Sequence, residues 1–503
     1  MRTIVAALLT TLTLAAEAQT FRVSGTLVDS ETRQPLARAQ IKLIEESREW
    51  NVITAVDGGF SFDVPQGKYQ LEASHHEWGD VYGEPVPGNR SGVAVVTGPD
   101  HNTTQLLFRF RRAAAFHGKI VDERGEPLPS ATIELFQQTI TRGRKHLESL
   151  SHAESNDFGE YSYSRLSAGT YYLAATGMPW YQRDLVRVGT TEDSGVRNVP
   201  YGMIYFPGSS NPGGATAVVL RPGAEFEADF VLRSASGANL HLRFPESMDG
   251  GYKMYAHGPM NAETLVRTCI YNCSGVPAVA PGNYVLYFSN PMGAARIPVS
   301  INGDGDVPIE VALKPVPSLA GKVVFSSQTQ RPPSPLFVNI EDQHSGKMTT
   351  LMIHADGTFS WPGAAIGQVR LHLSGSDGFF TERMSVEGAI VTNGIIDLSG
   401  GSNAKVEILA SGETGTLNGF IKNEELPAPG ALVVLAPSNG TSDPDRYFAT
   451  HASTDGSYTF TNVPAGEYVL FTVANSDFEY ASPQAVRPYL ATGKHVRING
   501  RLQ

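Results

Sequence analysis

The chain has 503 residues, of which 41% are hydrophobic and 18% are charged, and its net charge is −11. This length predicts several domains of about 100–200 residues each, and an acidic chain without a long basic run is unsuited to nucleic acid, whose binding needs clustered Lys and Arg. The 51 Gly, 19 Tyr and 23 Phe favour short strands and many turns, while 2 Cys exclude a scaffold held together by disulfides.

Residues 1–18 are predicted to form a secretory signal peptide. A positive start at Arg2 precedes an apolar stretch from Ile4 to Ala16, and small residues at Ala16 and Ala18 suit a signal peptidase. The alternative is a membrane anchor, but this stretch is shorter than the ~20 residues that span a bilayer. No later stretch approaches about 18 uninterrupted apolar residues. We therefore expect a mature chain without a membrane span that is extracytoplasmic, in the periplasm, at the cell surface or secreted.

An internal repeat organises the rest of the chain, with clear copies that begin at Gly25, Gly118 and Gly419. Each copy contains a Pro before an alternating apolar strand, an Asp-Gly type of turn before an aromatic strand, and a Gly-x-Tyr-x-Leu segment. In the middle copy these positions are Pro127, Ala131, Ile133, Leu135, Asp157, Gly159, Tyr161, Tyr163, Gly169, Tyr171 and Leu173. The period of two predicts strands with one buried face, and Gly and Asp suit the turns. Each copy therefore predicts a small antiparallel β-sandwich.

The fold class that follows is all-β, a tandem array of about five prealbumin-like or immunoglobulin-like sandwiches after the signal peptide. The predicted modules are residues 19–112, 113–234, 235–315, 316–412 and 413–503. The third and fourth are degenerate copies, and the third lacks the Asp-Gly turn. Residues 176–234 are too long for a plain loop and are expected to add strands to the second module.

The repeat resembles the carboxypeptidase regulatory-like domain. Its pattern, Gly-x-Val-x-Asp, then Gly-x-Pro-Leu-Pro-x-Ala-x-Ile-x-Leu, Asp-x-Gly-x-Tyr-x-Tyr and Leu-x-x-Gly-x-Tyr, matches best at residues 21–73, 116–175 and 415–475. The resemblance implies a transthyretin-like, carbohydrate-binding-like fold and at most a tendency to bind carbohydrate. Chains with several such units look like large secreted proteins of acidobacterial type. The matching residues are turn glycines and core aromatics, so the resemblance names no catalytic group.

A search for chemistry in the sequence predicts no catalytic residue, no metal site and no cofactor. None of the 13 His has a Glu three positions later, as a metallocarboxypeptidase site requires, and there is no nucleophile elbow. The cluster from His75 to Glu77 is interpreted as a solvated loop. The acidic stretch from Asn302 to Asp306 lacks the Gly and Glu of a calcium-binding EF-hand loop. We expect it to be a hairpin turn between two strands.

Cys269 and Cys273 are separated by three residues. In an oxidising compartment we expect a small structural disulfide, with free thiols as the next alternative. A redox or metal pair usually has two intervening residues, so this spacing disfavours that role.

Trp180 and Tyr181 are the candidate ligand-binding residues. Neighbouring aromatic rings form platforms for sugars, but in this turn-rich stretch a packing role for the pair is the competing interpretation.

Three classes of function remain. The first is a non-enzymatic protein of the cell envelope that binds carbohydrate or acts in adhesion or as a spacer. The second is an accessory part or unusual member of a system that degrades polysaccharide or peptide. The third is a scaffold that binds envelope proteins through strand edges.

Overall fold

Paired β-sheets occur throughout the computed structural model of the chain, which confirms the predicted all-β array of five small sandwiches. The structure describes residues 19–500 except 46–47, 76–92, 100, 102, 179–200, 236, 245–250, 271–272, 274, 291–292, 304, 327–334, 345, 347, 363–366, 376–377, 424–425, 429, 442, 454 and 474–476. The predicted signal peptide at residues 1–18 lies outside the described residues.

Module 1 shows the arrangement that the others repeat. Its strands are β1 (Thr20–Asp29), β2 (Gln40–Glu45), β3 (Arg48–Ile53), β4 (Gly59–Pro65), β5 (Gly67–Ser74), β6 (Val93–Thr97) and β7 (Leu106–Phe110). One sheet has the order β4-β1-β7 and the other the order β3-β2-β5-β6.

Modules 2 and 3 follow the same plan. Module 2 contains β8 (Ala114–Val121), β9 (Thr132–Thr141), β10 (Arg144–Glu154), β11 (Glu160–Leu166), β12 (Gly169–Gly177), β13 (Tyr201–Tyr205), the 3-10 helix η1 (Pro212–Gly214), β14 (Val218–Leu220), β15 (Glu225–Glu227) and β16 (Phe230–Val231). Module 3 contains β17 (Ala238–Arg243), β18 (Gly251–His257), η2 (Pro259–Asn261), β19 (Glu263–Cys269), β20 (Gly275–Val279), β21 (Gly282–Asn290), β22 (Gly293–Ile301) and β23 (Gly305–Glu310). Strands β13 and β14 extend one sheet of module 2, and β15 and β16 pair with β8 in the other.

Modules 4 and 5 complete the chain. Module 4 contains β24 (Leu319–Phe325), β25 (Phe337–Asp342), β26 (Met348–Met352), β27 (Thr358–Trp361), β28 (Gln368–Ser374), β29 (Phe380–Glu387), β30 (Ile390–Thr392), β31 (Ile395–Asp397) and β32 (Ala404–Ser411). Module 5 contains β33 (Thr414–Phe420), β34 (Lys422–Asn423), β35 (Leu426–Pro427), β36 (Leu432–Pro437), η3 (Pro444–Arg446), β37 (Phe448–His451), β38 (Ser457–Pro464), β39 (Gly466–Val473), the helix α2 (Pro483–Leu490) and β40 (Lys494–Ile498). No helix among the described residues is long and apolar enough to cross a membrane.

The alternating residues of the repeat form the cores, and Asp57 and Asp455 close the turns of modules 1 and 5. In module 2 Asn156, and not the predicted Asp157, accepts the hydrogen bonds of the turn, from the Phe158 and Glu160 amides at 2.9 Å. Along β4, Phe60, Phe62 and Val64 are buried while the residues between them are exposed. At the turn of this type in module 5, the Asp455 carboxylate accepts a hydrogen bond from the Ser457 amide at 2.9 Å. Gly456 there has a φ of +79°, which glycine adopts without strain. The predicted mechanism of the turn is therefore confirmed at Asp57 and Asp455.

The first and last strands of modules 1 to 4 run parallel, which the expectation of antiparallel sandwiches did not include. The parallel pairs are β1–β7, β8 with β15 and β16, β17–β23 and β24–β32. The chain thus enters and leaves a module in the same direction, so successive modules can follow one another.

The same geometry around one glycine recurs with this parallel pairing in modules 1, 2 and 4. A Cβ atom on Gly25, Gly118 or Gly321 would overlap a carbonyl oxygen of the last strand. These oxygens belong to Leu106, Ala228 and Val406. The glycine that opens each copy of the repeat therefore gives the last strand room to approach.

The predicted hairpin turn between Asn302 and Asp306 is wrong. Strand β22 pairs with β21, whereas β23 pairs with β17 in the opposite sheet. The segment therefore crosses from one sheet to the other. Alternation along two neighbouring strands indicates buried faces, but it does not indicate which strands pair.

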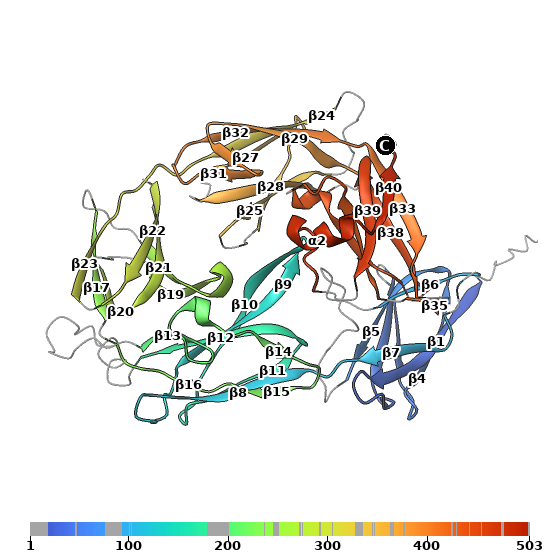
Figure 1. Ribbon diagram of the computed structural model, residues 1–503, viewed down its shortest axis with the longest axis horizontal. Coiled ribbons are helices and arrows are strands. Elements are labelled where there is room, and N and C mark those ends of the chain that lie inside the picture. The colour runs from blue at the N-terminus through green and yellow to red at the C-terminus, as the bar shows by residue number, and fades with distance from the viewer. Residues whose placement is uncertain are drawn as a thin grey trace, which may run out of the picture.

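The five modules form a closed ring, with module 1 beside module 5 (Figure 1). The β9–β10 hairpin of module 2 points across this ring towards α2 of module 5. The ring brings together elements that are far apart in the sequence.

We expect Gly118→Ala to lower the free energy of unfolding by about 1–3 kcal/mol, because the added methyl group must displace the backbone of Ala228. The matched control is Gly169→Ala in the same module, where the methyl group would make only ordinary contacts. Urea unfolding measures both. An equal effect of the two substitutions would contradict the proposed close approach.

Candidate functional site

The residues predicted to bind ligand lie outside the described part of the chain. Trp180 and Tyr181 fall within residues 179–200, and the pair therefore stays a prediction. His76 and Glu77 of the histidine cluster and Asp304 of the acidic loop also lie outside it. Among the described residues, no group of three or more His, Cys, Asp or Glu could hold a metal ion.

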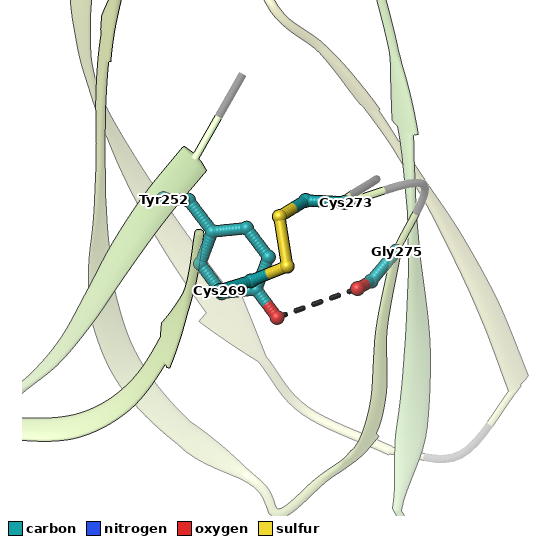
Figure 2. The surroundings of a disulfide bond; sticks show 4 residues. All are labelled: Tyr252, Cys269, Cys273 and Gly275. Atoms are coloured by element: carbon teal, nitrogen blue, oxygen red, sulfur yellow. Dashed lines mark hydrogen bonds between the residues drawn. A yellow bond between two sulfur atoms is a disulfide. The ribbon is translucent and has the colours of Figure 1, made fainter. Parts of the chain in front are cut away.

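Cys269 and Cys273 are joined by a disulfide in module 3 (Figure 2). Cys269 ends β19, and Cys273 is buried in the core of the module. The ring of Tyr252 lies beside the disulfide, and its hydroxyl donates a hydrogen bond of 3.3 Å to the Gly275 carbonyl oxygen. The disulfide therefore holds the end of β19 close to the start of β20, as a structural crosslink would.

The tip of the β9–β10 hairpin contacts module 5 directly. The Ala481 amide donates a hydrogen bond of 2.9 Å to the Gly143 carbonyl oxygen. Gly143 has a φ of +75°, and a Cβ atom there would overlap Tyr480 and Ala481. Only glycine combines this positive φ with the absence of a Cβ atom, so Gly143 suits the hairpin tip to this contact.

Charged residues from three modules meet next to the hairpin tip, in what we call the junction cluster: His372, Glu341, Asp445 and Arg142. The His372 ring on β28 contacts Asp445 of module 5 through Nδ1 at 2.7 Å and Glu341 of β25 through Nε2 at 3.0 Å. Arg142 of module 2 lies 3.9 Å from the other Asp445 oxygen. The cluster therefore links modules 2, 4 and 5.

The electrostatics of the junction cluster favour the charged forms of His372, Asp445 and Glu341. Burial disfavours the imidazolium of His372, which is 3% exposed, but the bonds to Asp445 and Glu341 outweigh burial and raise the pKa of His372 above 6.5. Burial likewise opposes ionisation of Asp445, yet His372 and Arg142 hold the pKa of Asp445 below 3.8. Burial opposes ionisation of Glu341 too, but its bond to His372 holds the pKa of Glu341 below 4.5.

This arrangement suits a structural contact between modules better than a catalytic site. Both ring nitrogens of His372 are engaged by carboxylates, so neither accepts a proton from a substrate or binds a metal without losing its contact. The sequence carried no signal for the cluster. His372 occupies a strand position that looks like any outward-facing residue, and its partners Asp445 and Arg142 belong to other modules.

Other polar contacts join modules around the ring. His101 Nδ1 of module 1 lies 2.8 Å from the Asp455 carboxylate of module 5. The Tyr205 hydroxyl of module 2 donates a hydrogen bond of 2.6 Å to the His257 carbonyl oxygen of module 3. The His101–Asp455 contact and the junction cluster join modules that are distant in sequence, whereas the Tyr205–His257 contact joins consecutive modules.

Comparison with known proteins supports the fold of the first module. Residues 22–97 match the model of the carboxypeptidase regulatory-like domain, which confirms the resemblance there. No characterised protein matches the chain in sequence.

Several solved structures are similar to the chain, with low scores. They include the TIE protein of Bacillus anthracis, at 10% identity and a TM-score of 0.20, over 78% of this chain and 74% of that chain. The minor pilin of Streptococcus agalactiae is 14% identical, with a TM-score of 0.21, over 42% of this chain and 96% of that chain. The major pilin subunit of Bacillus cereus is 10% identical, with a TM-score of 0.14, over 60% of this chain and 99% of that chain. Scores of this size show no common arrangement of the modules.

We expect His372→Gln to weaken the junction by about 1–2 kcal/mol at pH 6, because it removes a charged hydrogen-bond partner of two partly exposed carboxylates. Hydrogen exchange at the Asp445 and Arg446 amides of η3 measures the opening of this contact. His241→Gln is the matched control, since the His241–Asp306 pair is exposed and lies within module 3.

The free-energy difference between the wild type and His372→Gln should depend on pH. Because the pKa of His372 is raised, the stability that His372 gives the junction is fully present below pH 6.5. It is lost as the pH rises through that raised pKa. Because the pKa values of Asp445 and Glu341 are lowered, the stability that these carboxylates give the junction is fully present above pH 4.5. It is lost as the pH falls through the lowered pKa values. The difference between wild type and His372→Gln should thus be largest between these limits. A difference that grows towards pH 9 would contradict this assignment.

We expect the double substitution Cys269→Ser and Cys273→Ser to destabilise the chain by about 2 kcal/mol, because so short a loop restricts the unfolded chain only modestly. Denaturant unfolding with and without a reductant measures the effect. The reductant should destabilise the wild type and leave the double variant unchanged, and equal behaviour of the two would show that the thiols are free in solution.

Proposed function

We propose that this chain is a non-enzymatic extracytoplasmic protein that binds ligands in adhesion at the cell envelope. The observation that carries the proposal is the set of contacts between distant modules: Gly143 with Ala481, His372 with Asp445, and His101 with Asp455. These contacts join modules 1, 2 and 4 to module 5, and the Tyr205–His257 hydrogen bond joins module 3 to module 2, so the surfaces of the five sandwiches are held in fixed relative positions.

A closed body favours binding over a spacer role. A spacer separates its two ends, whereas here module 1 lies beside module 5 (Figure 1). Surfaces held in fixed relative positions bind a repeating ligand with a raised effective concentration. Polysaccharides are repeating ligands, and the resemblance to a carbohydrate-binding-like fold points to the same class.

The chemistry of the described clusters supports a non-catalytic role and an extracytoplasmic location. The buried His372 is committed to Asp445 and Glu341, and Cys269 is committed to Cys273. A disulfide persists in oxidising compartments, in agreement with the predicted signal peptide at residues 1–18.

A glycan array with the mature chain tests the proposed ligand class. We expect saturable binding to at least one envelope polysaccharide, and a loss of at least about tenfold in affinity after Trp180→Ala and Tyr181→Ala, because stacked aromatic rings supply much of the affinity for sugars. Phe158→Ala is the matched control, since Phe158 is an aromatic residue of the same module that is 67% exposed at a turn.

Two outcomes would contradict the proposal in different ways. Full binding after both substitutions would show that Trp180 and Tyr181 do not form the platform. Turnover of a glycoside or peptide panel by the mature chain would show that the protein is an enzyme.

A further inference from the structure

Two contacts of module 5 across module boundaries pair a carboxylate with an imidazole. Asp445 lies 2.7 Å from His372 of module 4, and Asp455 lies 2.8 Å from His101 of module 1. Module 5 thus meets both of its neighbours in the closed ring through a histidine (Figure 1). Histidine is the side chain whose charge changes closest to neutral pH, so the protonation of these residues bears on whether the ring stays closed.

His372 needs a proton on each ring nitrogen to keep both of its carboxylate partners. Nδ1 faces Asp445 at 2.7 Å and Nε2 faces Glu341 at 3.0 Å, and the side chain of His372 is 3% exposed. A carboxylate oxygen only accepts hydrogen bonds, and a neutral imidazole carries a single N–H. When His372 is neutral, one of its nitrogens therefore presents a lone pair to a carboxylate at a site that water barely reaches. Loss of the proton breaks one of the two contacts.

The contact that breaks is the one to module 5. Glu341 and His372 lie on β25 and β28, which pair within one sheet of module 4, so the backbone keeps these two side chains together. Asp445 belongs to η3 of module 5, and its side chain is 44% exposed against 27% for Glu341. The Asp445 carboxylate therefore turns to water at a lower cost. The remaining proton stays on Nε2, and neutral His372 is held only by its own module.

Other charged groups surround His372 from its own strand, from η3 and from the hairpin tip. They are Arg370, Asp443, Arg142 and Arg144. Burial and the like charge of Arg142 disfavour the imidazolium, but the direct bonds to Asp445 and Glu341 outweigh both and raise the pKa of His372. Protonation of His372 and docking of Asp445 therefore stabilise each other.

The hairpin tip of module 2 depends on the same carboxylate. Arg142 lies 3.9 Å from the second oxygen of Asp445, and the next residue, Gly143, accepts the hydrogen bond from the Ala481 amide. Only residues 412 and 413 lie between the last strand of module 4 and the first strand of module 5. Module 5 therefore turns about this short link as one body when η3 leaves His372, and Ala481 then leaves the tip.

We propose that module 5 is a proton-controlled gate of the ring, docked on module 4 and on the hairpin tip while His372 is an imidazolium and released when His372 becomes neutral. The His101–Asp455 contact holds the same gate on the side of module 1. The effect of the gate on ligand binding rests on the proposed function, because an open ring no longer fixes the relative positions of the module surfaces.

Small-angle X-ray scattering of the mature full-length chain between pH 6 and about 9.5 tests the gate, three units above the ordinary pKa of histidine. We expect a larger radius of gyration at the alkaline end. Hydrogen exchange at the buried Ala481 amide, which is bonded to Gly143, reports the same step. After correction for the intrinsic pH dependence of exchange, its protection should fall by up to about tenfold per pH unit above the pKa of His372. The amides of β12 in the core of module 2 should stay protected, which separates opening from unfolding.

Two substitutions should act in opposite directions. His372→Gln is uncharged, as the neutral imidazole is, so the Ala481 amide should already be about tenfold less protected at pH 6 and should change little with pH. Glu341→Gln supplies a side-chain amide that donates to an unprotonated Nε2 while the Nδ1 proton stays with Asp445. This variant should keep the ring closed at alkaline pH. The matched control is His241→Gln, whose exposed pair with Asp306 lies within module 3, and it should behave as the wild type does.

Several results would overturn the proposal. They are a radius of gyration that is the same at both ends of the pH range, protection of the Ala481 amide that does not change with pH, and opening of Glu341→Gln at the same pH as the wild type or at a lower one. An equal effect of His241→Gln and His372→Gln would assign the transition to the overall charge of the chain and not to the gate. No ligand enters these measurements, so their failure leaves the proposed carbohydrate binding to be tested by itself.

Discussion

The parallel pairing of the first and last strands is the constraint on which the architecture depends. It brings the chain out of each sandwich in the direction in which it entered, so that a new module begins where the previous one ends. The pairing requires a close approach of two backbones, and Gly118 and its counterparts permit that approach.

Most of the fold within a module follows from the sequence. The alternation in Ala131, Ile133 and Leu135 predicts a strand that is buried on one face, and the structure buries all three residues. The Asp-Gly turns form as expected because their geometry is local: the carboxylate and the amide it binds lie two residues apart. The residue boundaries of the modules stay a prediction.

What the sequence could not supply is the pairing of distant segments. The stretch after Ile301 was expected to turn back as a hairpin, yet β23 pairs with β17 more than sixty residues earlier. The junction cluster has the same origin, since His372 meets Asp445 and Arg142 only because the ring closes. A long-range contact of this kind depends on the orientation of whole modules, and no spacing or periodicity records it.

The β9–β10 hairpin also limits how this chain can change during evolution. A linear array of repeats gains or loses a unit by duplication or deletion with little effect on the remaining units, because each unit contacts only its neighbours. In this ring the tip at Gly143 reaches Ala481 across three intervening junctions. Adding or deleting a module would move Ala481 away from that tip. The copy number of the sandwich is therefore tied to the length of a single hairpin, and the two must change together.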